Sequence, residues 1–263
     1  MDCNNPIICS KHGTLVSLSE HCNNLFRFFR SEHPYDDDPV RNWFKVSSGI
    51  KGIDYDEGMF DITGSWCQPA FAYDEAMTKH LSDLIYQLTN FSLIWGGFES
   101  FVENLDLPDC PHQRGKINKA SYFLKEKYDS NFKLPEYYKN LVTMLENYLK
   151  LSASFTPDPT YFTRSDCAGS SGAGITIVKK IRNKFAHGIF DFGEPAQYES
   201  TGIYHGRIIH ISCRIVLITI QMILVAVYKQ NHFNVEKRNE QFEEGTLNSQ
   251  DFLFNLHLRN YNS

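Results

Sequence analysis

The most hydrophobic stretch of the chain spans residues 203–228 and is long enough, as a helix, to cross a membrane. Its interior carries His210, Arg214 and Gln221. A charged side chain at the middle of a bilayer is costly, so this composition argues against membrane insertion. We therefore expect a helix at the centre of a bundle, covered by other helices, and we keep it as a candidate dimer surface.

A second long apolar pattern runs over residues 72–105. Its large hydrophobic residues are spaced alternately by four and three positions, which is typical of a bundle helix. They are Leu84, Leu88, Phe91, Trp95, Phe98, Val102 and Leu105. Gly96 and Gly97 interrupt the pattern, and we expect close packing or a bend there because glycine weakens a helix.

Shorter periodic segments complete a mainly all-α prediction of a bundle of four or more helices. The additional helices are expected at residues 15–30, 116–128 and 135–151, with a motif helix from about residue 175. The expected organisation is an N-terminal extension at 1–70, a helical bundle at 71–230 and a tail at 231–263. Phe252, Leu253, Leu256 and Leu258 predict a short docking helix in the tail.

The extension at residues 1–70 has the least regular pattern. Aromatic residues between glycines leave room for one or two short strands, near residues 43–46 and 59–62. Three adjacent aspartates at 36–38 lie between Pro34 and Pro39. A metal site is one interpretation of these acids, but a solvated loop is the more common meaning of such a run.

Charge and cysteine usage narrow the classes of protein. A net charge of −5 argues against broad electrostatic binding of nucleic acid, although basic residues could still gather at one cleft. The seven cysteines form no Cys-x-x-Cys pair and no metal-ligand spacing with the ten histidines. We therefore expect reduced thiols, no metal and a cytoplasmic location, since residues 1–10 also lack the pattern of a signal peptide.

The motif helix ends in a distinctive polar sequence. At roughly 100° per residue, one apolar stripe carries the side chains of Ile175, Val178, Ile181 and Phe185. Arg182 lies on the shoulder of this stripe, whereas Asn183 and His187 share a face turned away from it. Gly188 is expected at the C′ position, where the helix ends.

The run Arg182-Asn183-Lys184-Phe185-Ala186-His187-Gly188 resembles the Arg-(four to six residues)-His motif of the HEPN superfamily. The resemblance extends over about residues 75–230, with motif strength only near 182–188. It implies a four-helix domain that is mostly dimeric. Many proteins of that superfamily are metal-independent endoribonucleases of toxin–antitoxin, abortive-infection and other defence systems. Ile189 stands where some subfamilies carry a tyrosine, so toxins regulated by adenylylation of that tyrosine are a poor model.

The resemblance assigns roles to the motif. His187 would be the general acid or base, Arg182 the phosphate and transition-state ligand, and Asn183 an orienting residue. RNA would be the substrate, with no cofactor, and a second copy of the motif from a homodimer would complete the site. These residue types suit the chemistry, because histidine titrates near neutrality and arginine matches phosphate geometry.

Other residues around the motif have two interpretations each. Glu99, or failing that Glu103, could pair with Arg182 across the helix interface, or both acids could point to water. Lys179 and Lys180 could contact RNA phosphates, or simply charge the helix end. The loop at residues 154–174 could shape the site or serve as a connector.

Plainer interpretations of the motif also stand. A histidine at a helix end is often a cap, and an arginine at a stripe edge is often a surface residue. Two functions therefore remain open from the sequence. The first is an endoribonuclease, as a toxin or antiviral effector with an inhibitor or activating partner protein. The second is a catalytically inactive module that binds RNA, nucleotide or a protein.

Overall fold

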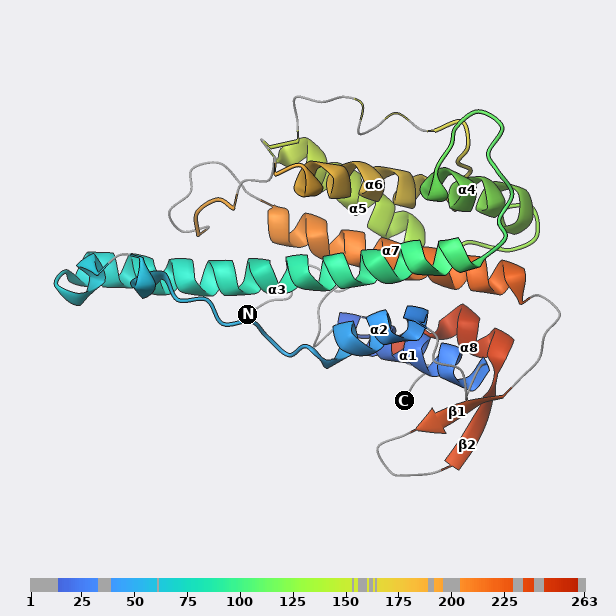
Figure 1. Cartoon of the computed structure of the whole chain (residues 1–263), viewed down its shortest axis with the longest axis horizontal. Helices are drawn as coiled ribbons and strands as arrows, with labels where there is room; N and C mark the ends of the chain where they lie inside the picture. Colours follow the sequence, from blue (N-terminus) through green and yellow to red (C-terminus); the bar gives the residue numbers. More distant parts are fainter. Residues whose placement is uncertain are drawn as a thin grey trace.

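The computed structural model shows a mostly helical protein, with eight α-helices and one two-stranded hairpin among the described residues (Figure 1). The structure describes residues 14–32, 39–60, 62–152, 154–155, 160, 163, 165–188, 192–195, 204–228, 234–238 and 244–259. The predicted all-α class and helical bundle are confirmed at this level.

Helix α7 (His205–Val227) lies at the centre of the bundle and matches the predicted helix at 203–228. It packs against α3 (Gln68–Asn104), α5 (Tyr138–Leu151) and α6 (Ala173–Ala186) (Figure 1). By length and composition α7 could cross a membrane, but 94% of its most apolar window is buried inside the chain. Its hydrophobic side chains are thus already covered, which leaves little apolar surface for a second copy.

Helix α3 follows the predicted pattern closely. Its buried positions include Leu84, Leu88, Phe91, Trp95, Phe98 and Val102. The two glycines mark close packing against α2 (Pro39–Gly49). A Cβ on Gly97 would lie 2.9 Å from Phe44 Cζ and 3.0 Å from Trp43 Cβ, so a larger residue would push the two helices apart.

The N-terminal segment is helical where strands were expected. The strand predicted near residues 43–46 is wrong, because α2 occupies this segment and buries Val40, Phe44 and Ser47 at helical spacing. The one predicted near 59–62 falls on a 3₁₀ turn, η1 (Glu57–Met59), and on residue 61, which lies outside the described residues. A second 3₁₀ turn, η2 (Thr63–Ser65), follows. Helices α1 (Leu18–Glu32) and α2 bury Leu25, Phe28 and Phe44 in the same hydrophobic core as α3 and α7.

Two predicted helices have different boundaries in the structure. Helix α4 (Lys116–Phe123) continues into a π-helical turn, η3 (Leu124–Tyr128), so the predicted span 116–128 holds both. Helix α5 begins three residues after Pro135 because Tyr137 adopts a left-handed conformation with φ of 65°.

The tail docks as predicted and adds an unpredicted hairpin. Helix α8 (Ser249–Asn255) and the turn after it bury Phe252, Leu253 and Leu256 completely, and Asn24 Nδ2 of α1 donates to Leu256 O at 2.8 Å. Strands β1 (Asn234–Arg238) and β2 (Glu244–Asn248) pair antiparallel, with Asn234 opposite Asn248. The hairpin lies beside α8 at one end of the molecule (Figure 1).

A polar cluster is buried between α7, α1 and the segment after α8. Gln221 Nε2 donates to His257 Nδ1 at 3.0 Å, and His257 Nε2 donates to Glu136 O at 3.3 Å. Arg214 is only 2% exposed, and its Nε and Nη1 atoms have no hydrogen-bond partner among the residues that the structure describes. The buried Nε2 atom of His210, on the same helix, likewise has no hydrogen-bond partner among the described residues. This cluster therefore holds polar groups that are costly to bury in charged form.

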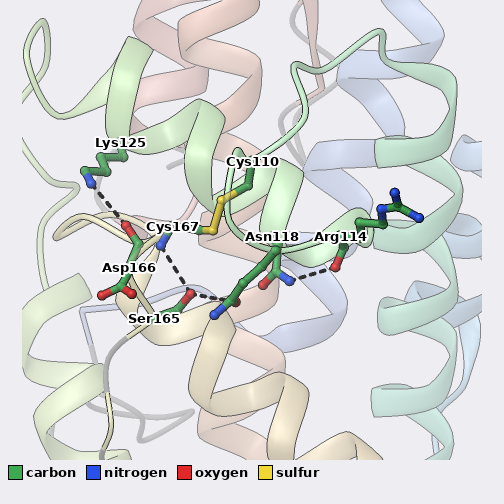
Figure 2. The surroundings of a disulfide bond; sticks show 8 residues. Cys110, Arg114, Asn118, Lys125, Ser165, Asp166 and Cys167 are labelled. Atoms are coloured by element: carbon green, nitrogen blue, oxygen red, sulfur yellow. Dashed lines mark hydrogen bonds between the residues drawn. A yellow bond between two sulfur atoms is a disulfide. The ribbon is translucent and has the colours of Figure 1, made fainter.

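A disulfide between Cys110 and Cys167 joins the segment after α3 to the segment before α6 (Figure 2). Their Cα atoms are 6.1 Å apart, and both residues are buried. Lys125 Nζ donates to Asp166 O at 3.1 Å beside the bridge. The expectation of reduced thiols is thus wrong for this pair, which closes a long loop. The structure shows Cys22, Cys67 and Cys213 as free thiols.

Loss of this disulfide should destabilise the fold. The bridge links residues 57 positions apart, so a Cys110→Ser, Cys167→Ser double variant should lose about 2–4 kcal/mol of unfolding free energy. Urea unfolding of the two proteins measures this difference. The control is Cys67→Ser, because Cys67 is an exposed free thiol. Equal stability of the double variant and the wild type would contradict the prediction.

Candidate functional site

The start of α6 is fixed by contacts with α5 and α7. Tyr138 Oη donates to Ser171 O at 2.5 Å and accepts from Gly174 N at 3.2 Å. A Cβ on Gly174 would lie 2.7 Å from Ile215 Cγ2, so only glycine lets α6 approach α7 this closely. On the same side, Ile175 and Ile181 are buried. This packing determines which side chains at the other end of α6 face solvent.

The side chain of Arg182 reaches from α6 toward α3, which agrees with the first of the two interpretations of the sequence. Its Nη2 atom is 3.9 Å from Glu99 Oε2, and its Cζ atom is 5.9 Å from the centroid of the Trp95 ring. The two charged side chains are 37% and 35% exposed, so the pair is open to water on one side. Glu103, the second candidate partner, instead pairs with Lys116. The guanidinium thus lies near an acid and an aromatic face and keeps accessible donors.

Asn183 and His187 are exposed at the end of α6. His187 is the C-cap residue, and its backbone N donates to Asn183 O at 3.0 Å. Gly188 has φ of +67°, which confirms the predicted C′ position. Five helical positions separate Arg182 from His187, so at roughly 100° per residue their directions diverge by about 140°. Within one chain, the arginine and the histidine therefore belong to different faces of the helix.

The lysines of α6 fasten the preceding loop. Lys180 Nζ donates to Thr163 O at 3.2 Å and also to Thr160 O. Lys184 Nζ donates to Ser154 O and lies 4.5 Å from the centroid of the Phe155 ring. Lys179 is partly buried on the same helix. In its described part, the loop at 154–174 is thus tied to the motif helix by Lys180, one of the two lysines considered as phosphate contacts, and by Lys184, which was not.

Two aromatic residues that contact basic side chains of α6 were not predicted from the sequence. Trp95 was assigned only to the packing seam, although it lies one helical turn before Glu99 and its ring faces Arg182. Its Nε1 atom is buried and has no hydrogen-bond partner in the described part of the chain. Phe155 had no periodic neighbours that would mark it, yet it is 1% exposed and packs edge-to-face with His205. Because both contacts join segments distant in sequence, local spacing does not reveal them.

Removing the acid partner tests whether the ion pair orients Arg182. A Glu99→Gln substitution should change the unfolding free energy by less than about 1 kcal/mol, since the pair is solvent-exposed. The same change should lower any activity that depends on the guanidinium direction. Urea unfolding and activity are measured together, with Glu103→Gln as the control. A loss of folding in Glu99→Gln, or equal activity losses in both variants, would contradict this role.

The described residues contain no group of three or more His, Cys, Asp or Glu side chains that could hold a metal ion. No family model matches the chain, and no curated protein or solved structure matches it either. The functional interpretation therefore depends on the motif residues and their geometry.

Proposed function

We propose that this protein is a metal-independent endoribonuclease of HEPN type, acting as a toxin or antiviral effector. The observation that carries the proposal is the placement of Arg182, held by Glu99 and Trp95 yet accessible, on the same helix end as the exposed Asn183 and His187. These three residues supply a permanent positive charge, an orienting amide and a titratable imidazole. No cofactor is needed for the reaction.

The reaction needs two proton transfers and one charge stabilisation. The ribose 2′-oxygen attacks the adjacent phosphorus after losing its proton, and the 5′-oxygen leaves after gaining one. An imidazole such as that of His187 can perform either transfer, because one ring nitrogen can accept a proton and the other can donate one. Arg182 offers parallel N–H donors to the phosphate oxygens as negative charge builds on them. The products are an RNA ending in a 2′,3′-cyclic phosphate and an RNA beginning with a 5′-hydroxyl.

A homodimer is part of this proposal. Because Arg182 and His187 diverge on α6, two motif helices facing each other could bring the arginine of one chain near the histidine of the other. A cytoplasmic location, where the RNA substrate is present, also belongs to the proposal. If the chain acts as a monomer, Arg182 and His187 point to different sides of α6 and cannot share one site. A monomer would therefore favour the second candidate, an inactive module that binds RNA, nucleotide or a protein.

The nature of the product ends tests the proposed reaction. The wild-type protein is incubated in EDTA with an RNA that it cleaves, and with the same RNA carrying 2′-deoxyribose at the cleaved position. We expect cleavage of the first RNA to a 2′,3′-cyclic phosphate and none at the modified position. Cleavage of both substrates, or cleavage only after a divalent metal is added, would contradict the mechanism. No cleavage by a dimeric, folded protein would favour the binding module.

A further inference from the structure

A second surface of the molecule is built from residues 50–83, which we call the arm. It comprises η1, η2 and the first turns of α3, and it extends beyond the other helices at one end of the molecule (Figure 1). The buried residues of α3 begin only at Leu84, so this half of the helix contributes nothing to the core. Packing of the helical bundle therefore does not account for the length and position of the arm.

The arm is held in shape by hydrogen bonds to side chains of α3. From the middle of α3 toward its N-terminus, Tyr86 Oη donates to Ile50 O at 3.3 Å, and Ser82 Oγ accepts from Tyr55 N at 3.1 Å. Further along, the backbone N of Glu57 donates to Thr78 Oγ1 at 3.1 Å. The segment before α3 thus runs back along the helix with a fixed register.

The tip of the arm is also closely packed. A Cβ on Gly64 would lie 2.2 Å from Asp74 Oδ2 and 3.2 Å from Phe71 Cα. A larger residue would therefore displace the Asp74 carboxylate and crowd the backbone at Phe71. The hydrogen bonds and this close approach together give the tip a defined surface.

That surface exposes large apolar side chains. Five of the ten exposed large hydrophobic residues in the described chain lie within residues 59–71. They are Met59, Phe60, Ile62, Trp66 and Phe71, with exposed fractions between 52% and 84%. Soluble proteins rarely leave such a concentration uncovered unless it binds something, and aromatic residues often dominate the energy of an interface.

The charge of the arm indicates what it binds. Residues 50–83 contain seven Asp or Glu and two Lys, a net charge of −5, which equals the net charge of the whole chain. The rest of the chain therefore has equal numbers of acidic and basic residues. A pocket of about 460 Å³ lies beside the apolar residues, lined by Asp56, Asp74 and Glu75 together with Lys79 and Phe71. An acidic surface repels RNA phosphates and also a second acidic arm, but attracts cationic side chains.

We propose that the arm is a docking site for a protein segment that forms a basic amphipathic helix. Apolar side chains of that segment would cover Trp66, Phe60 and Phe71, and its Lys or Arg residues would reach the acids of the pocket. This site is separate from the residues that carry the proposed RNA cleavage, and it does not depend on that activity.

Titration with a designed peptide tests the proposal on the full chain. The probe is a Lys/Leu amphipathic helix of about five turns, and the comparison peptides replace Leu by Ser or Lys by Glu. Isothermal titration calorimetry should show saturable binding of the Lys/Leu peptide and no binding of the two comparison peptides. Trp66→Ser should weaken this binding at least about tenfold, because a buried aromatic anchor often carries much of the binding energy of an interface. An Asp74→Asn, Glu75→Gln variant should weaken it and reduce its dependence on salt.

The matched control is Leu151→Ser, which removes a 61% exposed hydrophobic residue from α5. Its binding should equal that of the wild type, and circular dichroism should show all variants folded. Equal weakening by Leu151→Ser and Trp66→Ser would overturn the proposal. Two other results would also overturn it. If single-stranded RNA binds and Trp66→Ser abolishes this binding, the occupant is RNA. If the wild type has the mass of a dimer and Trp66→Ser has that of a monomer, the occupant is a second copy.

Discussion

Replacing Arg182 by lysine is expected to lower RNA cleavage about 100-fold or more, although the positive charge is kept. A guanidinium presents parallel donors to a phosphate, whereas an ammonium acts as a point charge. The structure holds this guanidinium between Glu99 and the Trp95 ring, which a lysine would contact differently. Because the pair is exposed, the substitution should cost little stability. The measurement is the single-turnover cleavage rate of one RNA substrate in EDTA.

The control for this substitution is Arg114→Lys. Arg114 is exposed, and its backbone O accepts a hydrogen bond from Asn118 Nδ2 at 2.8 Å, which the substitution leaves intact (Figure 2). The Arg114→Lys protein should cleave RNA at the wild-type rate. A cleavage rate for Arg182→Lys within threefold or so of the control would contradict a role for the guanidinium fork.

The second large effect is loss of stability at mildly acidic pH. Burial, helped by nearby Arg214, lowers the pKa of His210 to about 3. Burial likewise lowers the pKa of His257 to about 4, against a raising effect of its bond to Glu136 O. His21 has a pKa well below its ordinary value, mainly through burial and then through Arg214. These histidines are therefore neutral in the folded protein and charged in the unfolded chain below about pH 6.5.

The sign of the effect follows from these lowered pKa values. The unfolded state binds more protons than the folded state between pH 6.5 and about 4, so stability present above pH 6.5 is lost as the pH falls through this window. Each histidine should contribute about 1.4 kcal/mol per pH unit. Urea unfolding at pH 7.5, 6 and about 5 measures the slope.

His210→Leu isolates one contribution to this slope. Because no described residue forms a hydrogen bond with the buried Nε2 atom of His210, leucine should be tolerated and the slope should fall by about 1.4 kcal/mol per pH unit. His112→Leu, at an exposed position, should leave the slope unchanged. Identical slopes for the wild type and His210→Leu would contradict a neutral buried His210.

Features with strong local periodicity could be predicted from the sequence. The apolar length of α7 and the four-three spacing in α3 each define a buried face, so both helices were predicted within a few residues. The pairing of Arg182 with Glu99 was one of two interpretations that the sequence allowed, because each lies at the edge of the buried face of its helix, and the structure shows this pair. The end of α6 at Gly188 followed from the usual preference for glycine at that position.

Contacts between distant segments could not be predicted in this way. The Cys110–Cys167 bridge depends on how two loops meet, and no local spacing indicates it. Helix α2 was mistaken for a strand because its aromatic residues resemble a strand composition, and only tertiary packing of Phe44 decides the matter. The contacts of Lys184 with Ser154 and Phe155 likewise depend on the path of the loop.

The most direct test of the proposed activity is the cleavage of RNA in EDTA by His187→Ala. Both His187 and His112 are exposed, so His112→Ala is a matched control, and both variants should fold and have the oligomeric mass of the wild type. We expect His187→Ala to lose at least about 100-fold in cleavage rate, as removal of a general acid or base does, and His112→Ala to lose nothing. Cleavage by His187→Ala at the wild-type rate would contradict the assignment of the motif as the catalytic site.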